Sequence, residues 1–129
     1  MNIQPLRVFF LATLVALLAA CAEPIYNVKD APVTTNMSSP TLDDVTQAIR
    51  RAGASLGWQM KEETPGHMVG TLNLRKHQAI VDITYNLNEF SIQYRDSSNL
   101  DYDGTNIHRN YNGWIHNLEN QIKVQLTAL

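Results

Sequence analysis

The amino-acid sequence predicts an α+β fold, a two-layer sandwich in which two helices cover one face of a four-stranded antiparallel meander. Apolar residues recur at helical spacing in two stretches, over 42–56 and over 111–126. Between them, over 58–95, apolar and polar residues alternate with a period of two, and turn-forming groups interrupt the alternation. One apolar and one polar sheet face is typical of a sheet covered on one side, which predicts the order α-β-β-β-β-α.

The first helix is predicted to begin after Pro40. Thr41 is a favourable N-cap residue, and Asp44, three positions later, completes a pattern close to a capping box. Gly57 is a typical residue at which a helix ends. The apolar face between these signals is formed by Leu42, Val45, Ala48, Ile49, Ala52 and Leu56. We expect this face to pack against the sheet.

Four strands are predicted between 58 and 95, separated by turns at 64–66, 75–76 and 86–88. The face expected to be buried carries Trp58, Met60, Met68, Leu72, Leu74, Ala79, Val81, Ile83, Tyr85, Phe90, Ile92 and Tyr94. The face expected to meet solvent carries Gln59, Lys61, Thr71, Asn73, Asp82, Thr84, Ser91, Gln93 and Arg95.

A second helix is predicted after a polar loop over 96–109. Its apolar stripe consists of Tyr111, Trp114, Ile115, Leu118, Ile122 and Leu126. We expect Tyr111 and Trp114 to anchor this helix in the core rather than to stack on a ligand. A single globular domain is therefore predicted over residues 41–129.

Residues 1–20 have the features of a secretory signal peptide. Arg7 supplies a positive charge near the amino terminus, residues 8–18 are apolar except for Thr13, and small residues follow. The apolar run ends at Glu23, which makes it shorter than the roughly 20 residues of a membrane-spanning helix. We therefore expect residues 1–20 to direct export.

The motif Leu18-Ala19-Ala20-Cys21 closely resembles the lipobox of bacterial lipoproteins, and Cys21 is the sole cysteine of the chain. The resemblance implies that the Cys21 sulfur receives a diacylglycerol, that cleavage precedes Cys21, and that the new amino terminus is acylated. Several acyl chains on one residue hold a protein firmly to a membrane. By the same resemblance, the residue that follows the cysteine, Ala22 rather than Asp, implies that the protein is sent to the outer membrane, with its domain facing the periplasm. An ordinary signal peptide with a chance cysteine is the alternative.

Residues 21–40 are predicted to be a flexible tether between Cys21 and the domain. They contain three prolines, many short polar side chains and no sustained apolar period. A flexible coil of this length reaches roughly 25 Å. Such a tether would keep the domain near the membrane without holding it in contact.

The charge of the chain excludes some partners. Its 129 residues carry a formal net charge of −2 at pH 7, without the basic surface that binds nucleic acid. The sequence also lacks a polybasic strip that would bind anionic lipid. The expected partners are the membrane, through the lipid anchor, and another envelope component, with a protein favoured. The oligomeric state is left open.

The stretch over 95–114 is the candidate binding region, because it is dense in short polar and aromatic side chains. Together with the turn at 75–76 it would bring together Arg75, His77, Asn99, Tyr102, His108 and Asn110, with Tyr111 at the floor. The alternative is a structural loop, in which His108 bonds to the turn at 75–77 or to the loop backbone. Asn106, Asn110 and Asn112 would then cap or brace the last helix.

A calcium site is a second alternative for this loop. Asn99, Asp101, Asp103 and Gly104 match the first, third, fifth and sixth positions of a helix-loop-helix calcium loop, but Asn110 stands where a bidentate Glu is needed. Zinc is disfavoured because no two of the histidines are four apart on a helix. A small-ligand or metal-ion binder is therefore the alternative function.

Catalysis has little support in the sequence. Ser97, Ser98 and His108 lie in one polar loop, but no nucleophile elbow accompanies them. Asp101 and Asp103, in an exposed loop, would both stay ionised rather than divide into an acid and a base. The sequence predicts a non-enzymatic protein without a cofactor.

Four motifs resemble a family of small, largely uncharacterised exported bacterial proteins and lipoproteins. They are Gly57-Trp58, Arg75-Lys76-His77, the stretch over 97–102 and the stretch from Ile107 to Leu118. The resemblance implies a shared fold over most of residues 41–123. It implies no particular activity.

Overall fold

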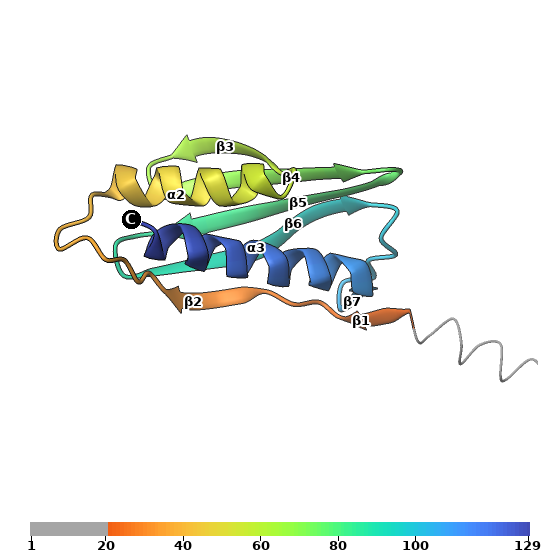
Figure 1. Cartoon of the computed structure of the whole chain (residues 1–129). Coiled ribbons are helices and arrows are strands. Elements are labelled where there is room, and N and C mark those ends of the chain that lie inside the picture. Colours follow the sequence, from red (N-terminus) through yellow and green to blue (C-terminus); the bar gives the residue numbers. More distant parts are fainter. Residues whose placement is uncertain (1–20) are drawn as a thin grey trace, which may run out of the picture.

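The computed structural model describes residues 21–129, so the predicted signal peptide, residues 1–20, lies outside the described residues. Residues 21–129 contain no helix that is long and apolar enough to cross a membrane. The elements are β1 (Ala22–Pro24), β2 (Val28–Pro32), α2 (Leu42–Ser55), β3 (Gln59–Thr64), β4 (His67–Leu74), β5 (His77–Tyr85), β6 (Glu89–Ser98), β7 (Asn106–His108) and α3 (Arg109–Thr127). Both helices lie on one face of a five-stranded antiparallel sheet, which confirms the predicted α+β class (Figure 1).

The large sheet has the strand order β2-β6-β5-β4-β3, and strands β3 to β6 form the predicted meander. Its turns fall where the sequence places them. Gly66 in the first turn has a φ of 82° and Arg75 in the second has a φ of 55°. The period of two is preserved in the pairing of β4 with β5, where Met68 lies opposite Ile83 and Leu72 lies opposite Ala79.

Strand β2 is the fifth strand, and its presence shows that the flexible tether predicted over 21–40 is wrong for this segment. Val28 pairs with Ile92 and Ala31 pairs with Phe90 of β6, with a shift of register between the two pairs. Asp30 lies at this irregularity with a φ of 52°. Because the bulge lies between the two buried residues, Val28 and Ala31, and breaks the alternation there, no period of two is visible in the sequence.

The rest of this amino-terminal segment is also joined to the fold. Strand β1 pairs with β7 in a small two-stranded sheet. The backbone N–H of Ile25 donates to the carbonyl of Thr105, and that of Val33 donates to the carbonyl of Asn88. Residues 22–33 therefore run along the edge of the domain beside β6 and α3 (Figure 1).

The ends of helix α2 follow the predicted signals. The Thr41 hydroxyl accepts from the backbone N–H of Asp44, and the Asp44 carboxylate accepts from the backbone N–H of Thr41, which is a complete capping box. At the other end Gly57 has a φ of 87°. The N–H of Trp58 there donates to the carbonyl of Gly53 across the turn, as in a Schellman motif.

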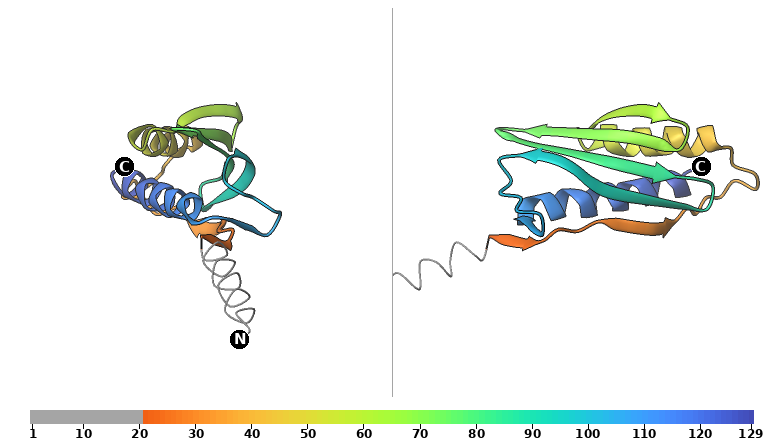
Figure 2. Two further views of the ribbon diagram at one scale, coloured as in Figure 1. Left: turned by 90° about the vertical axis from the view of Figure 1, so that its right-hand side faces the viewer. Right: turned by 180° about the vertical axis from the view of Figure 1, so that it is seen from behind.

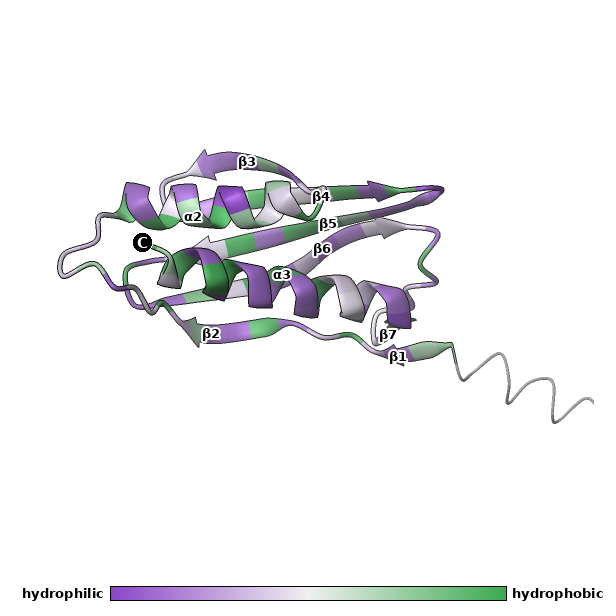
Figure 3. Cartoon of the chain, in the orientation of Figure 1, coloured by the Kyte–Doolittle hydropathy of each residue, from purple (hydrophilic) through white to green (hydrophobic). Residues whose placement is uncertain are grey.

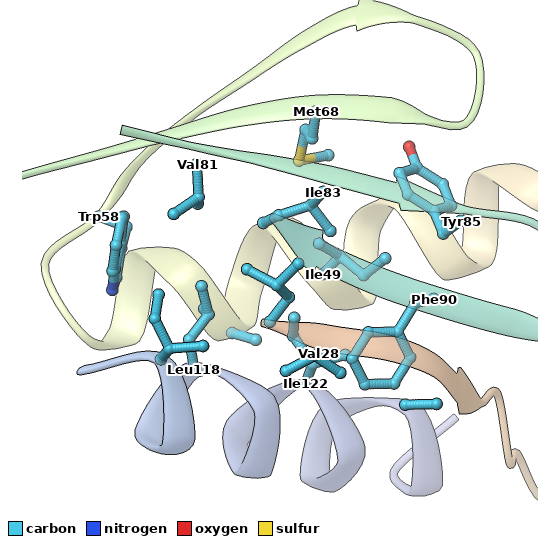
Figure 4. Packing of buried hydrophobic residues seen from close by; sticks show 14 of the residues in the cluster. Val28, Ile49, Trp58, Met68, Val81, Ile83, Tyr85, Phe90, Leu118 and Ile122 are labelled. Carbon is cyan, nitrogen blue, oxygen red and sulfur yellow. The ribbon is translucent and has the colours of Figure 1, made fainter. Parts of the chain in front are cut away.

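The hydrophobic core lies between the two helices and the sheet (Figure 4). Ile49 from α2, Leu118 and Ile122 from α3, and Phe90 from β6 meet there, and each is at most 1% exposed. Val28 of β2 belongs to the same cluster, at 3% exposure. The amino-terminal strand therefore contributes to the core and does not only border it.

The hairpin of β4 and β5 extends past the helix layer, and its tip is hydrophilic (Figure 3). For this reason Leu74, predicted to be buried, is 45% exposed. Within residues 21–129 no element covers the other face of the sheet, so that face is open, as predicted for its polar side chains (Figure 2).

Candidate functional site

The candidate residues from the turn and the loop converge at one end of the molecule. This end, which we call the Cys21 end, consists of residues 21–24, 74–77 and 99–109. The left view of Figure 2 looks directly onto it. Because β4, β5 and β6 are antiparallel neighbours, the β4–β5 turn and the carboxyl end of β6 lie at the same end of the sheet.

Two hydrogen bonds fix the loop to the β4–β5 turn. The carbonyl of Asn99 lies 2.8 Å from Nδ1 of His77, and the Asn99 side-chain amide donates to the carbonyl of Lys76 at 2.7 Å. Asn99 adopts a φ of 59°, a conformation that Asn tolerates better than most residues. The sequence correctly predicts that these residues meet, and they do so through bonds within the protein.

His108 has a different role from the predicted one. Its Nδ1 accepts the backbone N–H of Asn110 at 3.2 Å and thereby caps α3. Its own backbone N–H, rather than its ring, bonds to the loop at the carbonyl of Leu100. The rings of His77 and His108 lie 6.2 Å apart, centroid to centroid. His108 therefore bridges loop and helix mainly as a structural residue.

Tyr111 is completely buried beneath the loop. The edge of its ring contacts Tyr94, at a centroid distance of 5.7 Å, and the exposed Tyr102 covers Tyr94 at 4.1 Å. The Tyr111 hydroxyl has no hydrogen-bond partner among residues 21–129. Burial raises the pKa of this hydroxyl far above its usual value. Tyr111 thus packs as a core anchor, as the sequence predicts, and does not line an open site.

In the loop that resembles a calcium site, Asp103 forms hydrogen bonds with the loop's own backbone. Oδ1 of Asp103 accepts the backbone N–H groups of Asn106 at 2.7 Å and Thr105 at 2.9 Å. These two bonds hold the pKa of the Asp103 carboxyl below its usual value. Within residues 21–129 no three His, Cys, Asp or Glu side chains are grouped so that they could hold a metal ion. Asp103 therefore closes a turn of the loop.

Asn112, on the first turn of α3, fixes the amino-terminal segment to the helix. Its Oδ1 accepts the backbone N–H of Tyr26 at 2.9 Å, and its Nδ2 donates to the carbonyl of Pro24 at 2.9 Å and to Glu23 at 3.2 Å. The Tyr26 ring stacks on His116, with centroids 4.0 Å apart. The sequence only suggests that Asn112 braces the last helix, because its partners are far away along the chain.

Cys21 lies at the point where the chain enters the fold. The backbone N–H of Arg109 donates to the carbonyl of Cys21 at 3.1 Å, while the side chain of Cys21 is exposed. A shallow depression of about 510 Å³ lies beside this point and is lined in part by Glu23, Arg109 and Trp114. Cys21 is therefore joined directly to the folded domain, without the flexible tether that the sequence predicts.

Several charged side chains form a cluster on the open face of the sheet. The sequence predicts this cluster only in part. Oδ1 of Asp82 lies 2.7 Å from Nε2 of His67 and 3.4 Å from Nη1 of Arg95. Arg95 also contacts Glu63, at 3.3 Å. The alternation places Asp82 and Arg95 on this face, but their pairing depends on the register of three strands. At partly exposed positions such pairs contribute little to stability.

Comparisons with protein-family models, with curated proteins and with solved structures find no match to this chain. Its function is therefore argued from its own residues and their geometry.

Proposed function

We propose that this chain is a bacterial envelope lipoprotein, anchored through acylated Cys21 to the outer membrane and facing the periplasm. In this proposal its domain is a non-enzymatic module that binds another envelope component. The observation that carries the proposal is the position of Cys21, which directly follows a signal-like segment and has an exposed side chain. An acyl chain can be attached there without disturbing the core.

The state of the candidate residues supports binding rather than acid–base chemistry. The rings of His77 and His108 and the carboxylate of Asp103 are engaged in bonds that shape the loop and cap α3. Arg75 and Tyr102 are exposed on the same end of the molecule. A loop fixed by its own bonds, with exposed side chains at its surface, is typical of a recognition surface on a rigid scaffold.

The anchor is tested by replacing Cys21 in the full-length protein. We expect Cys21→Ser to abolish acylation and to release the protein from the membrane fraction, because the thiol accepts the lipid. Mass spectrometry of the amino-terminal peptide and fractionation of cells report the two effects. Ser55→Ala, on α2, is the matched control and should leave both unchanged. An unacylated wild-type protein would contradict the proposal.

A small-ligand or calcium binder remains the competing function, and a thermal titration tests it. A ligand that binds the folded state raises the melting temperature, by an amount that grows with the logarithm of its concentration above Kd. We expect no rise with calcium, because the Asp103 carboxylate already accepts two backbone N–H groups. A clear rise that Asp103→Asn abolishes would favour the competing function.

A further inference from the structure

We infer that the envelope component bound by the Cys21 end is the phospholipid surface itself, so that the domain stands on the headgroups by this end. This inference rests on the proposed acylation of Cys21. It goes beyond an anchor, because an anchor on a flexible tether would leave the domain without a fixed orientation. It also assigns a partner to the exposed candidate residues Arg75 and Tyr102.

The absence of a tether in the described residues carries the first step. Cys21 is hydrogen-bonded to the first residue of α3, Arg109, and Ala22 pairs directly with His108. Asn112 then fixes the next residues of the chain to the helix. Acyl chains that begin at Cys21 therefore begin at the surface of the folded domain. The Cys21 end must lie at the membrane surface when these chains are inserted.

The chemistry of this end fits a headgroup layer. Arg75, Lys76 and Arg109 are exposed, and within residues 21–129 none of them forms an ion pair. Each of these side chains can donate hydrogen bonds to phosphate oxygens. Tyr102 is 39% exposed and Leu74 is 45% exposed at the same end, and both side chains suit the boundary between headgroups and acyl chains.

The acidic residues of this end equal the cations in number, so the end carries no net charge. The Asp103 carboxylate accepts hydrogen bonds from the loop backbone, and the Glu23 carboxylate accepts one from the Asn112 side-chain amide. Asp101 is the third exposed carboxylate of this end, beside Glu23 and Asp103. The cations therefore contribute single contacts with lipid phosphates, and the orientation is set by the position of Cys21 rather than by a net positive charge.

The opposite end of the sheet supplies an internal control. Leu87, in the β5–β6 turn, is 45% exposed, as is Leu74. Strand β5 separates the two turns by nine residues, which is about 30 Å in an extended strand. Leu74 and Leu87 therefore differ in position relative to Cys21 but not in exposure. In the proposed orientation only Leu74 reaches the headgroups.

Photocrosslinking in membranes tests the orientation. Leu74, Tyr102 or Leu87 is replaced by photoreactive benzoylphenylalanine in the full-length protein, made in cells with its signal segment. Membranes are irradiated, and phospholipid adducts are counted by mass spectrometry. We expect at least fivefold more lipid adduct from positions 74 and 102 than from position 87. Equal yields, or a discrete protein adduct from positions 74 and 102, would overturn the inference.

The amino terminus is analysed in the same samples, so that the two failures are distinguished. Unmodified Cys21 would remove the proposed anchor, whereas acylated Cys21 with equal adduct yields would remove only the docked orientation. Arg109→Glu separates docking from folding, because a negative charge at the start of α3 favours the helix. We expect this variant to keep the melting temperature and to lose at least half of the lipid adduct at position 102. An unchanged yield would contradict a role for the cations.

Discussion

At the scale of single residues, two buried tyrosines of the core differ in how their hydroxyls are satisfied. The hydroxyl of Tyr85 lies 2.7 Å from that of Thr46, between the sheet and α2. The hydroxyl of Tyr111 has no partner among residues 21–129. A buried polar group without a partner costs the free energy of its lost hydration, whereas a paired one regains it. Removal of the hydroxyl therefore changes the free energy of unfolding differently at the two tyrosines.

We expect Tyr111→Phe to leave the free energy of unfolding unchanged or to raise it, and Tyr85→Phe to lower it by about 1 kcal/mol. The first change removes an unsatisfied hydroxyl, and the second leaves the Thr46 hydroxyl with one partner fewer. Urea unfolding of both variants, with equal m-values, measures the difference. A loss of stability in Tyr111→Phe as large as that in Tyr85→Phe would mean that a bound molecule normally satisfies the Tyr111 hydroxyl.

At the scale of elements, the start of α2 depends on one carboxylate. The backbone N–H of Thr41 and its hydroxyl hold the pKa of Asp44 below its usual value. Because the folded pKa is lower than the unfolded one, near 3.9, the contribution to stability is complete above the unfolded pKa. It is lost as the pH falls through the folded pKa. The capping box is therefore an acid-sensitive part of this helix.

We expect Asp44→Asn to weaken the dependence of the melting temperature on pH below about 5, relative to the wild type. Thermal scans between neutral pH and pH 3 measure this dependence. Asp43→Asn is the matched control, because Asp43 also lies in the first turn but does not bond to Thr41. If both variants flatten the profile equally, the helix dipole rather than the capping box is responsible.

The elements also show which parts of the fold can be predicted from sequence. The meander and both helices are predictable because periodicity, turn residues and caps are local signals. Strand β2 is not, because Ala31 follows Val28 across a bulge and the strand pairs with β6, far along the chain. The candidate loop is predicted to meet the turn at 75–77, and it does. Its internal bonds, such as that of Asp103 to its own backbone, depend on φ and ψ values that the sequence leaves free.

At the scale of the whole molecule, both edges of the sheet are protected against pairing with other chains. Strand β3 carries Lys61, Glu62 and Glu63 and has an irregular register near its end. Strand β2 has its bulge and ends at Pro32. Charges, bulges and proline at an edge hinder the addition of a further strand. Without β2, the long strand β6 would instead become an edge.

We expect deletion of residues 22–33 to lower the melting temperature by more than 10 °C and to promote aggregation. The deletion removes buried Val28 and Ala31 from the core and uncovers β6. Thermal unfolding and size-exclusion chromatography measure the two effects. Insertion of two glycines between Ser38 and Ser39, in the loop between β2 and α2, is the control and should change little. If the deletion changes neither the melting temperature nor aggregation, residues 22–33 behave as the flexible tether that the sequence predicts.

The Asn112 contact with Tyr26 joins residues that are 86 positions apart. During synthesis the amino-terminal strand is made first, yet it has nothing to pair with until β6 and α3 have emerged. Long-range closure of this kind is slow, because the entropy of the intervening chain is lost before the contacts form. We therefore expect the segment next to Cys21 to close last in folding. The cysteine would accordingly stay accessible to modifying enzymes throughout synthesis, and the segment beside it would become fixed to β7 and α3 only afterwards.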